Sequence, residues 1–99
     1  MTDPFENRIK IREQILKKHF DNESLILNLN NENYYGLDAV GTRFLEVLLE
    51  SDSIRCAYET LLEEYDVEPE TLQKDLIKLL NVLEQNGIIE ILPENNPQF

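Results

Sequence analysis

Residues 24–41 read SLILNLNNENYYGLDAVG, and we expect the rest of the chain to be organised around this stretch. Leu25, Leu27 and Leu29 occupy every second position. That period predicts a β-strand with three large apolar side chains on one face, and we assign this face to the core. Residues 30–33, all asparagine or glutamate, tolerate left-handed backbone geometry and hydrogen-bond their own backbone, which predicts a turn.

The second half of this stretch predicts a hairpin partner that leads directly into a helix. Residues 34–37, YYGL, form a second short strand in this interpretation, and Asp38 stands where a helix N-cap belongs. If residues 34–37 lie at the edge of a sheet, their unpaired amides and carbonyls are a template for another chain. This edge is the first candidate for a functional surface.

Two segments before the hairpin also have strand character. Residues 8–12 alternate isoleucine with charged residues, and residues 14–20 contain the apolar pair Ile15-Leu16, although KIREQILKKHF is also compatible with a short helix. The turn cluster at residues 21–23 makes the segments 14–20 and 24–30 natural hairpin partners. Together with residues 34–37 they predict a three-stranded antiparallel sheet.

Three helices are predicted after the hairpin. The first begins at the Asp38 cap and the second at a Ser53 or Asp52 cap. The third is bounded by Pro69, which suits the first helical position, and by Gly87, which suits the residue after the C-cap. The expected apolar stripes are Val40, Phe44, Val47 and Leu48 in the first helix, Ile54, Ala57, Tyr58, Leu61, Leu62 and Tyr65 in the second, and Leu72, Leu76, Leu79, Leu80 and Leu83 in the third.

The length and composition suit one small domain. The chain has 99 residues, of which 41% are apolar, and we expect a single domain of residues 1–99 with its core at about residues 8–92. Residues 88–92, IIEIL, predict a last short strand. Residues 1–7 are expected to fray, and the tail 93–99, with two prolines, is expected to be disordered.

Several functional classes are disfavoured by composition. No run of about eighteen apolar residues predicts a membrane span, and no apolar segment near the N-terminus predicts a secretory signal. The single cysteine, Cys56, excludes an internal disulfide, so we expect a cytoplasmic protein. The formal net charge of −11 disfavours nucleic acid as a partner. Five of the nine basic residues lie in the first twenty positions, and we interpret them as a solvated strand face rather than a contact for an acidic partner: Arg8, Lys10, Arg12, Lys17 and Lys18.

The residues that carry catalysis are sparse. His19 is the only histidine and Cys56 the only cysteine, so neither a Cys/His metal cluster nor a Cys–His catalytic pair with any redundancy is expected. We interpret His19 as a polar strand-end residue and Cys56 as a small buried or half-buried side chain. No glycine-rich phosphate loop is present. We therefore expect no catalytic residues, no metal and no cofactor.

The order of three helices and a terminal strand is that of a winged helix-turn-helix, here with strands in front, so we predict an α+β fold. One alternative function is a DNA-binding transcriptional regulator that reads the groove with residues 72–86. The exposed positions of that segment carry two bases and two acids, which suits a DNA groove poorly. A scaffold for a folded protein partner is another alternative.

Four segments carry a family resemblance through their order and spacing: YYGLDAVG (residues 34–41), YDV (65–67), Asp75-Leu76 and LEQNGII (83–89). Through them the chain resembles the PqqD-like family, also described as the RiPP precursor peptide recognition element. The resemblance covers about residues 8–92. It implies a three-stranded sheet on a winged helix-turn-helix. It also implies a non-catalytic adaptor that takes up the leader region of a ribosomally synthesised precursor peptide as a fourth antiparallel strand, beside the third strand and against the third helix.

Within that family the chain is most similar to the stand-alone leader-binding proteins of lasso-peptide biosynthesis. This resemblance implies a leader peptidase and an ATP-dependent cyclase, or another maturation enzyme, as partners. A PqqD-type chaperone for a radical enzyme is the alternative within the family. We expect neither nucleic acid nor membrane as a partner.

The expected site lies between the strand edge and one side of the third helix. The Asp75, Lys78 and Val82 side is preferred over the side with Ile77 and Glu84, because an apolar floor edged by both charges suits an amphipathic peptide. Residues 33–37 supply the edge, and the glycine in it permits a second backbone to approach closely. The candidate peptide-binding residues are Asn33, Tyr34, Tyr35, Gly36, Leu37, Leu72, Asp75, Leu76, Lys78, Leu79 and Val82.

Overall fold

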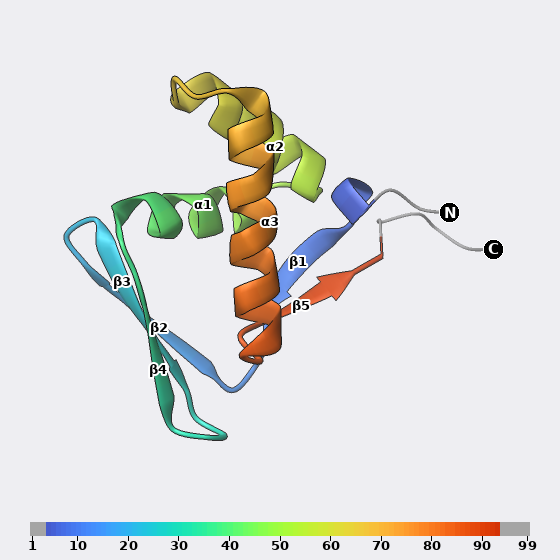
Figure 1. The fold of residues 1–99 in the computed structure, drawn as a ribbon. Coiled ribbons are helices and arrows are strands. Elements are labelled where there is room, and N and C mark those ends of the chain that lie inside the picture. The colour runs from blue at the N-terminus through green and yellow to red at the C-terminus, as the bar shows by residue number, and fades with distance from the viewer. Residues whose placement is uncertain (1–3, 94–99) are drawn as a thin grey trace.

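The computed structural model describes residues 4–93, which form a three-stranded antiparallel sheet, a two-stranded antiparallel sheet and three α-helices (Figure 1). The α+β class and the order of a three-stranded sheet followed by three helices are as predicted. Within residues 4–93 no helix is both long and apolar enough to cross a membrane. The elements are η1 (Pro4–Glu6), β1 (Arg8–Ile11), β2 (Ile15–Phe20), β3 (Glu23–Asn28), β4 (Asn33–Leu37), α1 (Ala39–Glu50), α2 (Ile54–Glu64), α3 (Pro69–Gln85) and β5 (Ile89–Leu92).

The three-stranded sheet has the order β2-β3-β4, but β3 presents the opposite face to the core from the one predicted. Leu25 and Leu27 are only half-buried, and Leu29 is 51% exposed. The buried residues of β3 are instead Ser24, Ile26 and Asn28. A period of two identifies a strand without identifying its inner face, and here the inner face carries two polar residues that bond to the helices.

The side chains of those two polar residues, Ser24 and Asn28, both have hydrogen-bond partners. The Ser24 hydroxyl lies 2.8 Å from the Thr42 hydroxyl in α1, and the Thr42 hydroxyl donates to the Leu37 carbonyl at 3.3 Å. The Asn28 side-chain amide donates to the Asn86 carbonyl, just after α3, at 3.2 Å. Buried polar groups stabilise a fold when their hydrogen bonds are made. β3 is therefore tied to α1 at one end and to the end of α3 at the other.

The helix boundaries follow the predicted capping residues. The Asp38 carboxylate accepts from the Gly41 amide at 2.8 Å, and the Ser53 hydroxyl accepts from the Cys56 amide at 3.1 Å. Gly87 follows α3 with φ of +70°, a conformation that glycine adopts at little cost. The core lies where the helices meet the sheets, and its largest fully buried side chains are Ile26, Leu45, Leu48, Leu61, Leu72, Leu76, Leu83, Ile88 and Ile89.

Two burial predictions in the helices are wrong. Val40 is 47% exposed, because it lies in the first turn of α1, where the helix leaves the sheet. Cys56 is exposed, because it lies beside the apolar stripe of α2 and not within it. The remaining stripe residues of α2 are buried or half-buried, as predicted.

The predicted strands near the two ends of the chain pair with each other, β1 with β5, in a register that places Ile9 opposite Ile91. The expectation that residues 1–7 fray is wrong for residues 4–7. Phe5 is only 8% exposed, and its ring packs edge-on to Tyr58 with centroids 5.6 Å apart. The Arg55 guanidinium lies over the same ring, 5.7 Å from its centroid. Residues 1–3 and 94–99, including most of the predicted tail, lie outside the described residues.

Candidate functional site

The three-stranded sheet has two outer strands, β2 and β4, and they differ in charge. β2 carries Lys17, Lys18 and His19, and lysine on an edge strand discourages the addition of another strand. β4, with the sequence NYYGL, carries no charged side chain. The edge of β4 is therefore the one better suited to main-chain pairing with another chain.

A cleft of about 260 Å³ lies beside β4, between the sheet, the first turns of α1 and the middle of α3. Its apolar surface comes from Phe44, Val40, Leu79 and Val82, together with the ring of Tyr35. The full lining is Tyr35, Asp38, Val40, Gly41, Phe44, Asp75, Lys78, Leu79 and Val82. An aliphatic or aromatic side chain from a peptide on β4 suits such a cleft.

Charged groups lie at the rim of this cleft. Asp75 and Lys78 are exposed on α3, and Asp38 is exposed at the start of α1. One carboxylate oxygen of Asp38 caps α1, and the other is not needed for that bond. The rim thus offers partners for a basic group and an acidic group on either side of an apolar side chain.

The cleft closes toward the end of β4 that is nearest the β3–β4 turn. There a hollow of only about 10 Å³ remains between β4 and the end of α3, lined in part by Asn33, Tyr34 and Tyr35. The hydrogen bond from Asn28 to Asn86 spans this region. Tyr35 borders both spaces, so the usable cleft lies on the α1 side of Tyr35.

Gly41 sets how closely α1 approaches β4. A Cβ atom at this position would lie 3.2 Å from Leu37 Cδ2 and 3.3 Å from Asp38 Oδ1, which is tighter than ordinary packing. The glycine therefore lets the first turn of α1 pack against the end of β4, where it forms one wall of the cleft.

The structure brings together some of the residues that the sequence nominated. Five line the cleft: Tyr35, Asp75, Lys78, Leu79 and Val82. Tyr34 is 70% exposed on the opposite face of β4 from Tyr35, and Gly36 is exposed at the edge. The side chains of Leu37, Leu72 and Leu76 are at most 6% exposed and belong to the core, so Leu37 offers the edge only its main chain.

The wall that α1 contributes, formed by Asp38, Val40, Gly41 and Phe44, is not predicted from the sequence. The helical spacing of Val40 and Phe44 predicts the buried stripe of the first helix instead. The available signal was that only Asp38 separates β4 from α1, so the first turn of this helix has to lie beside the edge.

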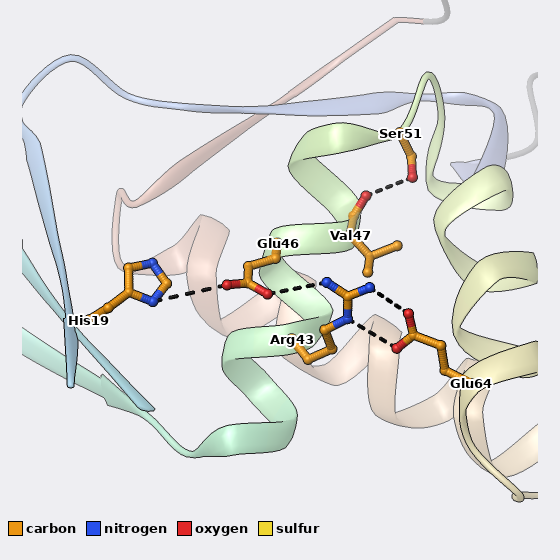
Figure 2. A network of polar contacts seen from close by, with 6 residues as sticks. All are labelled: His19, Arg43, Glu46, Val47, Ser51 and Glu64. Carbon is orange, nitrogen blue, oxygen red and sulfur yellow. Dashed lines mark hydrogen bonds and ion pairs between the residues drawn. The ribbon is translucent and has the colours of Figure 1, made fainter. Parts of the chain in front are cut away.

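A second, larger cleft of about 550 Å³ lies where β2, α1 and α2 approach each other, and its lining is mostly polar. Figure 2 shows its network. Arg43 donates from Nε to Glu64 at 3.0 Å and from Nη1 to Glu46 at 3.3 Å. Nδ1 of His19 lies 4.0 Å from Glu46, an ion pair only when the imidazole is protonated.

Arg43 is the centre of this network and joins α1 to α2. Its hydrogen bonds lower the pKa of the Glu64 carboxyl, and the same contacts raise the pKa of the guanidinium. Within residues 4–93 no group of three or more His, Cys, Asp or Glu side chains is placed to hold a metal ion. Because the charged side chains of this cleft bond to each other, we interpret their network as a structural link between α1 and α2.

Comparison with known proteins identifies relatives of this fold. The family model described as coenzyme PQQ synthesis protein D (PqqD) matches residues 23–89. A solved structure of TbiB1 in complex with the TbiA(beta) leader peptide is similar at 29% identity and a TM-score of 0.76, over 90% of this chain and 99% of that chain. A lasso peptide synthetase B1 complexed with the leader peptide is similar at 23% identity and a TM-score of 0.76, over 84% and 98% of the two chains. No curated protein sequence matches.

Proposed function

The chain belongs to the PqqD family, and from this premise we propose that it is a non-catalytic adaptor that binds the leader region of a ribosomally synthesised precursor peptide. The leader adds to β4 as a fourth antiparallel strand. One observation carries the proposal: the uncharged edge of β4 lies directly beside an apolar cleft that α1 and α3 complete. The similar TbiB1 structure is itself a complex with a leader peptide.

Strand addition fits the chemistry of this site. Main-chain hydrogen bonds to β4 supply affinity with little dependence on sequence, and alternate peptide side chains supply selectivity. Every second side chain of the leader faces the cleft, where an apolar one packs against Phe44, Leu79 and Val82. A charged side chain two positions along the leader points to the same side and meets Asp75 or Lys78.

The partners follow from the same proposal. An adaptor that holds the leader presents the attached core peptide to enzymes, which we take to be a leader peptidase and a cyclase of a lasso-type pathway. The similarity to TbiB1, whose structure is a complex with the TbiA(beta) leader peptide, supports the peptide partner. We treat residues 1–99 as one recognition domain. The alternative within the family is a PqqD-type chaperone, for which the enzyme served is a radical enzyme.

The test is a titration of a fluorescent synthetic leader, encoded with this chain, followed by anisotropy. We expect saturable binding, and we expect Val82→Asp, in the cleft, to weaken it at least about tenfold, because a carboxylate then replaces an apolar contact. Ile77→Asp is the matched control, because Ile77 is exposed on α3 outside this cleft. No saturable binding by the wild type, or equal losses in both variants, would contradict the proposal.

DNA binding has little support. The exposed residues of α3 carry both charges, and the chain has a net charge of −11. A regulator would bind DNA with an affinity that falls steeply with salt concentration. We expect no binding to duplex DNA even at low salt, where a measurable retarded band would favour the regulator instead.

A further inference from the structure

The charged side chains at the rim of the cleft beside β4 are not paired with one another. Asp38, Asp75 and Lys78 line this cleft, and all three are exposed. Within residues 4–93 none of them forms an ion pair, although Asp75 and Lys78 lie only one turn apart on α3. The charges of the larger cleft, in contrast, pair with one another through Arg43. The three rim charges are therefore available to a ligand.

The groove between β4 and α3 has a direction, because the two elements run antiparallel (Figure 1). Asn86, at the end of α3, borders the same small hollow as Asn33, at the start of β4. The middle of α3, from Asp75 to Val82, borders the same cleft as Asp38, which directly follows β4. A path along the groove from Asp38 toward the β3–β4 turn therefore follows α3 in chain order.

The cleft is acidic at one end and apolar at the other. Lys78 follows Asp75 by about 4.5 Å along the helix axis, and Val82 follows it by about 10.5 Å, because an α-helix rises about 1.5 Å per residue. Asp38 lies at the same end as Asp75, since it follows the last residue of β4. Two carboxylates thus stand at this end, the ammonium of Lys78 comes next, and the apolar surface of Val82 lies beyond it.

A leader strand that runs antiparallel to β4 meets the carboxylates first and the apolar end afterwards. We call the leader residue that packs against Leu79 and Val82 the anchor. Side chains on one face of a strand recur about every 6.8 Å. Along α3, Asp75 lies about 6 Å from Leu79 and about 10.5 Å from Val82. The leader positions two and four residues before the anchor therefore stand over the carboxylates.

We propose that the cleft selects leaders with a basic side chain two or four residues before the anchor, bound by Asp38 and Asp75. This inference rests on the proposed function and adds the order of charges that the adaptor recognises. The aliphatic stem of a lysine or arginine packs on Val40, which is 47% exposed, while its charged end reaches the carboxylates. An acidic side chain at that position meets two like charges. Lys78 repels a cation placed at the anchor itself, so the preference depends on position.

The experiment measures, by fluorescence anisotropy, the affinity of the synthetic leader encoded with this chain and of a set of its single-residue variants. Each lysine and arginine of the leader is replaced in turn by glutamine, and each large apolar residue by alanine. The full chain is used as the wild type, as Val82→Ala and as Asp38→Asn/Asp75→Asn, in which asparagine keeps the N-cap of α1. The anchor is the apolar leader residue whose effect is not additive with that of Val82→Ala.

The expected result is a coupling between one basic leader residue and the two carboxylates. Replacing that residue, two or four positions before the anchor, should weaken binding to the wild type at least about fivefold. The same replacement should change binding to Asp38→Asn/Asp75→Asn by less than about twofold. High salt should reduce the coupling, because exposed charges are screened.

The matched control is Glu59→Gln/Glu63→Gln, which removes two exposed charges on α2, outside the cleft. It changes the net charge by the same amount, and the basic leader residue should keep its full effect there. If the Asp38/Asp75 variant loses its cooperative thermal transition, Asp75→Asn alone replaces it. A leader that binds without any basic residue coupled to the carboxylates, a coupled residue that lies after the anchor, or an equal loss of coupling in the control would overturn the inference. Failure of the leader itself to bind the wild type would overturn the proposed function instead.

Discussion

Asn28 in β3 and Asn86 at the end of α3 are joined by a 3.2 Å hydrogen bond from the Asn28 side-chain amide to the Asn86 carbonyl. The two residues are far apart in sequence. Their bond connects the sheet to α3, and these two elements flank the cleft. Asn28 is only 5% exposed, and its side-chain oxygen also accepts from the Asn30 amide at 3.0 Å. One side chain thus sets both the β3–β4 turn and the distance between β4 and α3.

Asn28→Ala should therefore affect stability and leader binding together. Loss of these buried hydrogen bonds should lower the free energy of unfolding by about 1–3 kcal/mol in urea denaturation. Leader affinity should also fall, although Asn28 lies outside the main cleft, because α3 is no longer fixed against β4. Asn81→Ala, an exposed change on α3, is the control and should alter neither quantity. A destabilised variant with unchanged leader affinity would show that this bond does not position the groove.

Gly87→Ala tests the same junction from the other side. The backbone at Gly87 has φ of +70°, and a Cβ atom there would lie 3.3 Å from the Asn28 side-chain nitrogen. We expect alanine to cost about 1–2 kcal/mol in the free energy of unfolding, because L-residues are strained in this region. Gly36→Ala is the matched comparison, since its Cβ meets nothing, and should leave the melting temperature nearly unchanged. Equal effects at both positions would contradict this account.

The Arg43–Glu64 pair predicts a pH-dependent contribution to stability. Arg43 lowers the pKa of Glu64 below its ordinary value of 4.5, so the folded state favours the ionised carboxylate. The contribution is present above pH 4.5 and is lost as the pH falls through the lowered value. The wild type should be more stable than Glu64→Gln at pH 7, and the difference should shrink as the pH falls below 4.5. Thermal melts across this range measure it.

The control for that series is Glu63→Gln, which removes an identical charge one residue earlier. Glu63 has no ion pair within residues 4–93. Its variant should not show the same pH-dependent loss. High salt should also reduce the Glu64 effect, because both partners are accessible to solvent. An effect of Glu64→Gln that is constant with pH would exclude the ion pair as its cause.

The sequence was sufficient to predict where the helices and strands lie, but not which face of each strand is buried. Asp38, Ser53, Pro69 and Gly87 act through their immediate neighbours, so capping rules located the helix ends. Leu25, by contrast, belongs to the more apolar face of an alternating strand, yet the face with Ser24 and Asn28 is the buried one, because those side chains form hydrogen bonds with residues distant in sequence.

The candidate site was likewise only partly predictable from the sequence. The edge of β4 and the flank of α3 with Lys78 were predictable from strand and helix periods. The wall from α1 was not, because it depends on the packing of Gly41 against Leu37. The pairing of β1 with β5 also had no local signal, since its partners lie at opposite ends of the chain.

A pair of proline variants tests strand addition directly. In an antiparallel strand the amides of successive residues point alternately to the neighbouring strand and to the free edge. One of Tyr34 and Tyr35 therefore pairs its amide with β3, and the other presents it outward. Proline removes that amide donor. We expect one variant to lose thermal stability and the other to fold normally but bind the leader at least about tenfold more weakly.

The same pair on the opposite edge is the control. Lys17→Pro and Lys18→Pro alter β2, the other outer strand of the sheet. One of them should also destabilise the fold, and the other should leave both folding and leader binding intact, because the leader adds at β4. Circular dichroism melts identify the folded member of each pair, and anisotropy with the labelled leader gives its affinity. If the folded β2 variant loses binding and the folded β4 variant keeps it, the leader adds to β2 and the assignment of the groove is wrong.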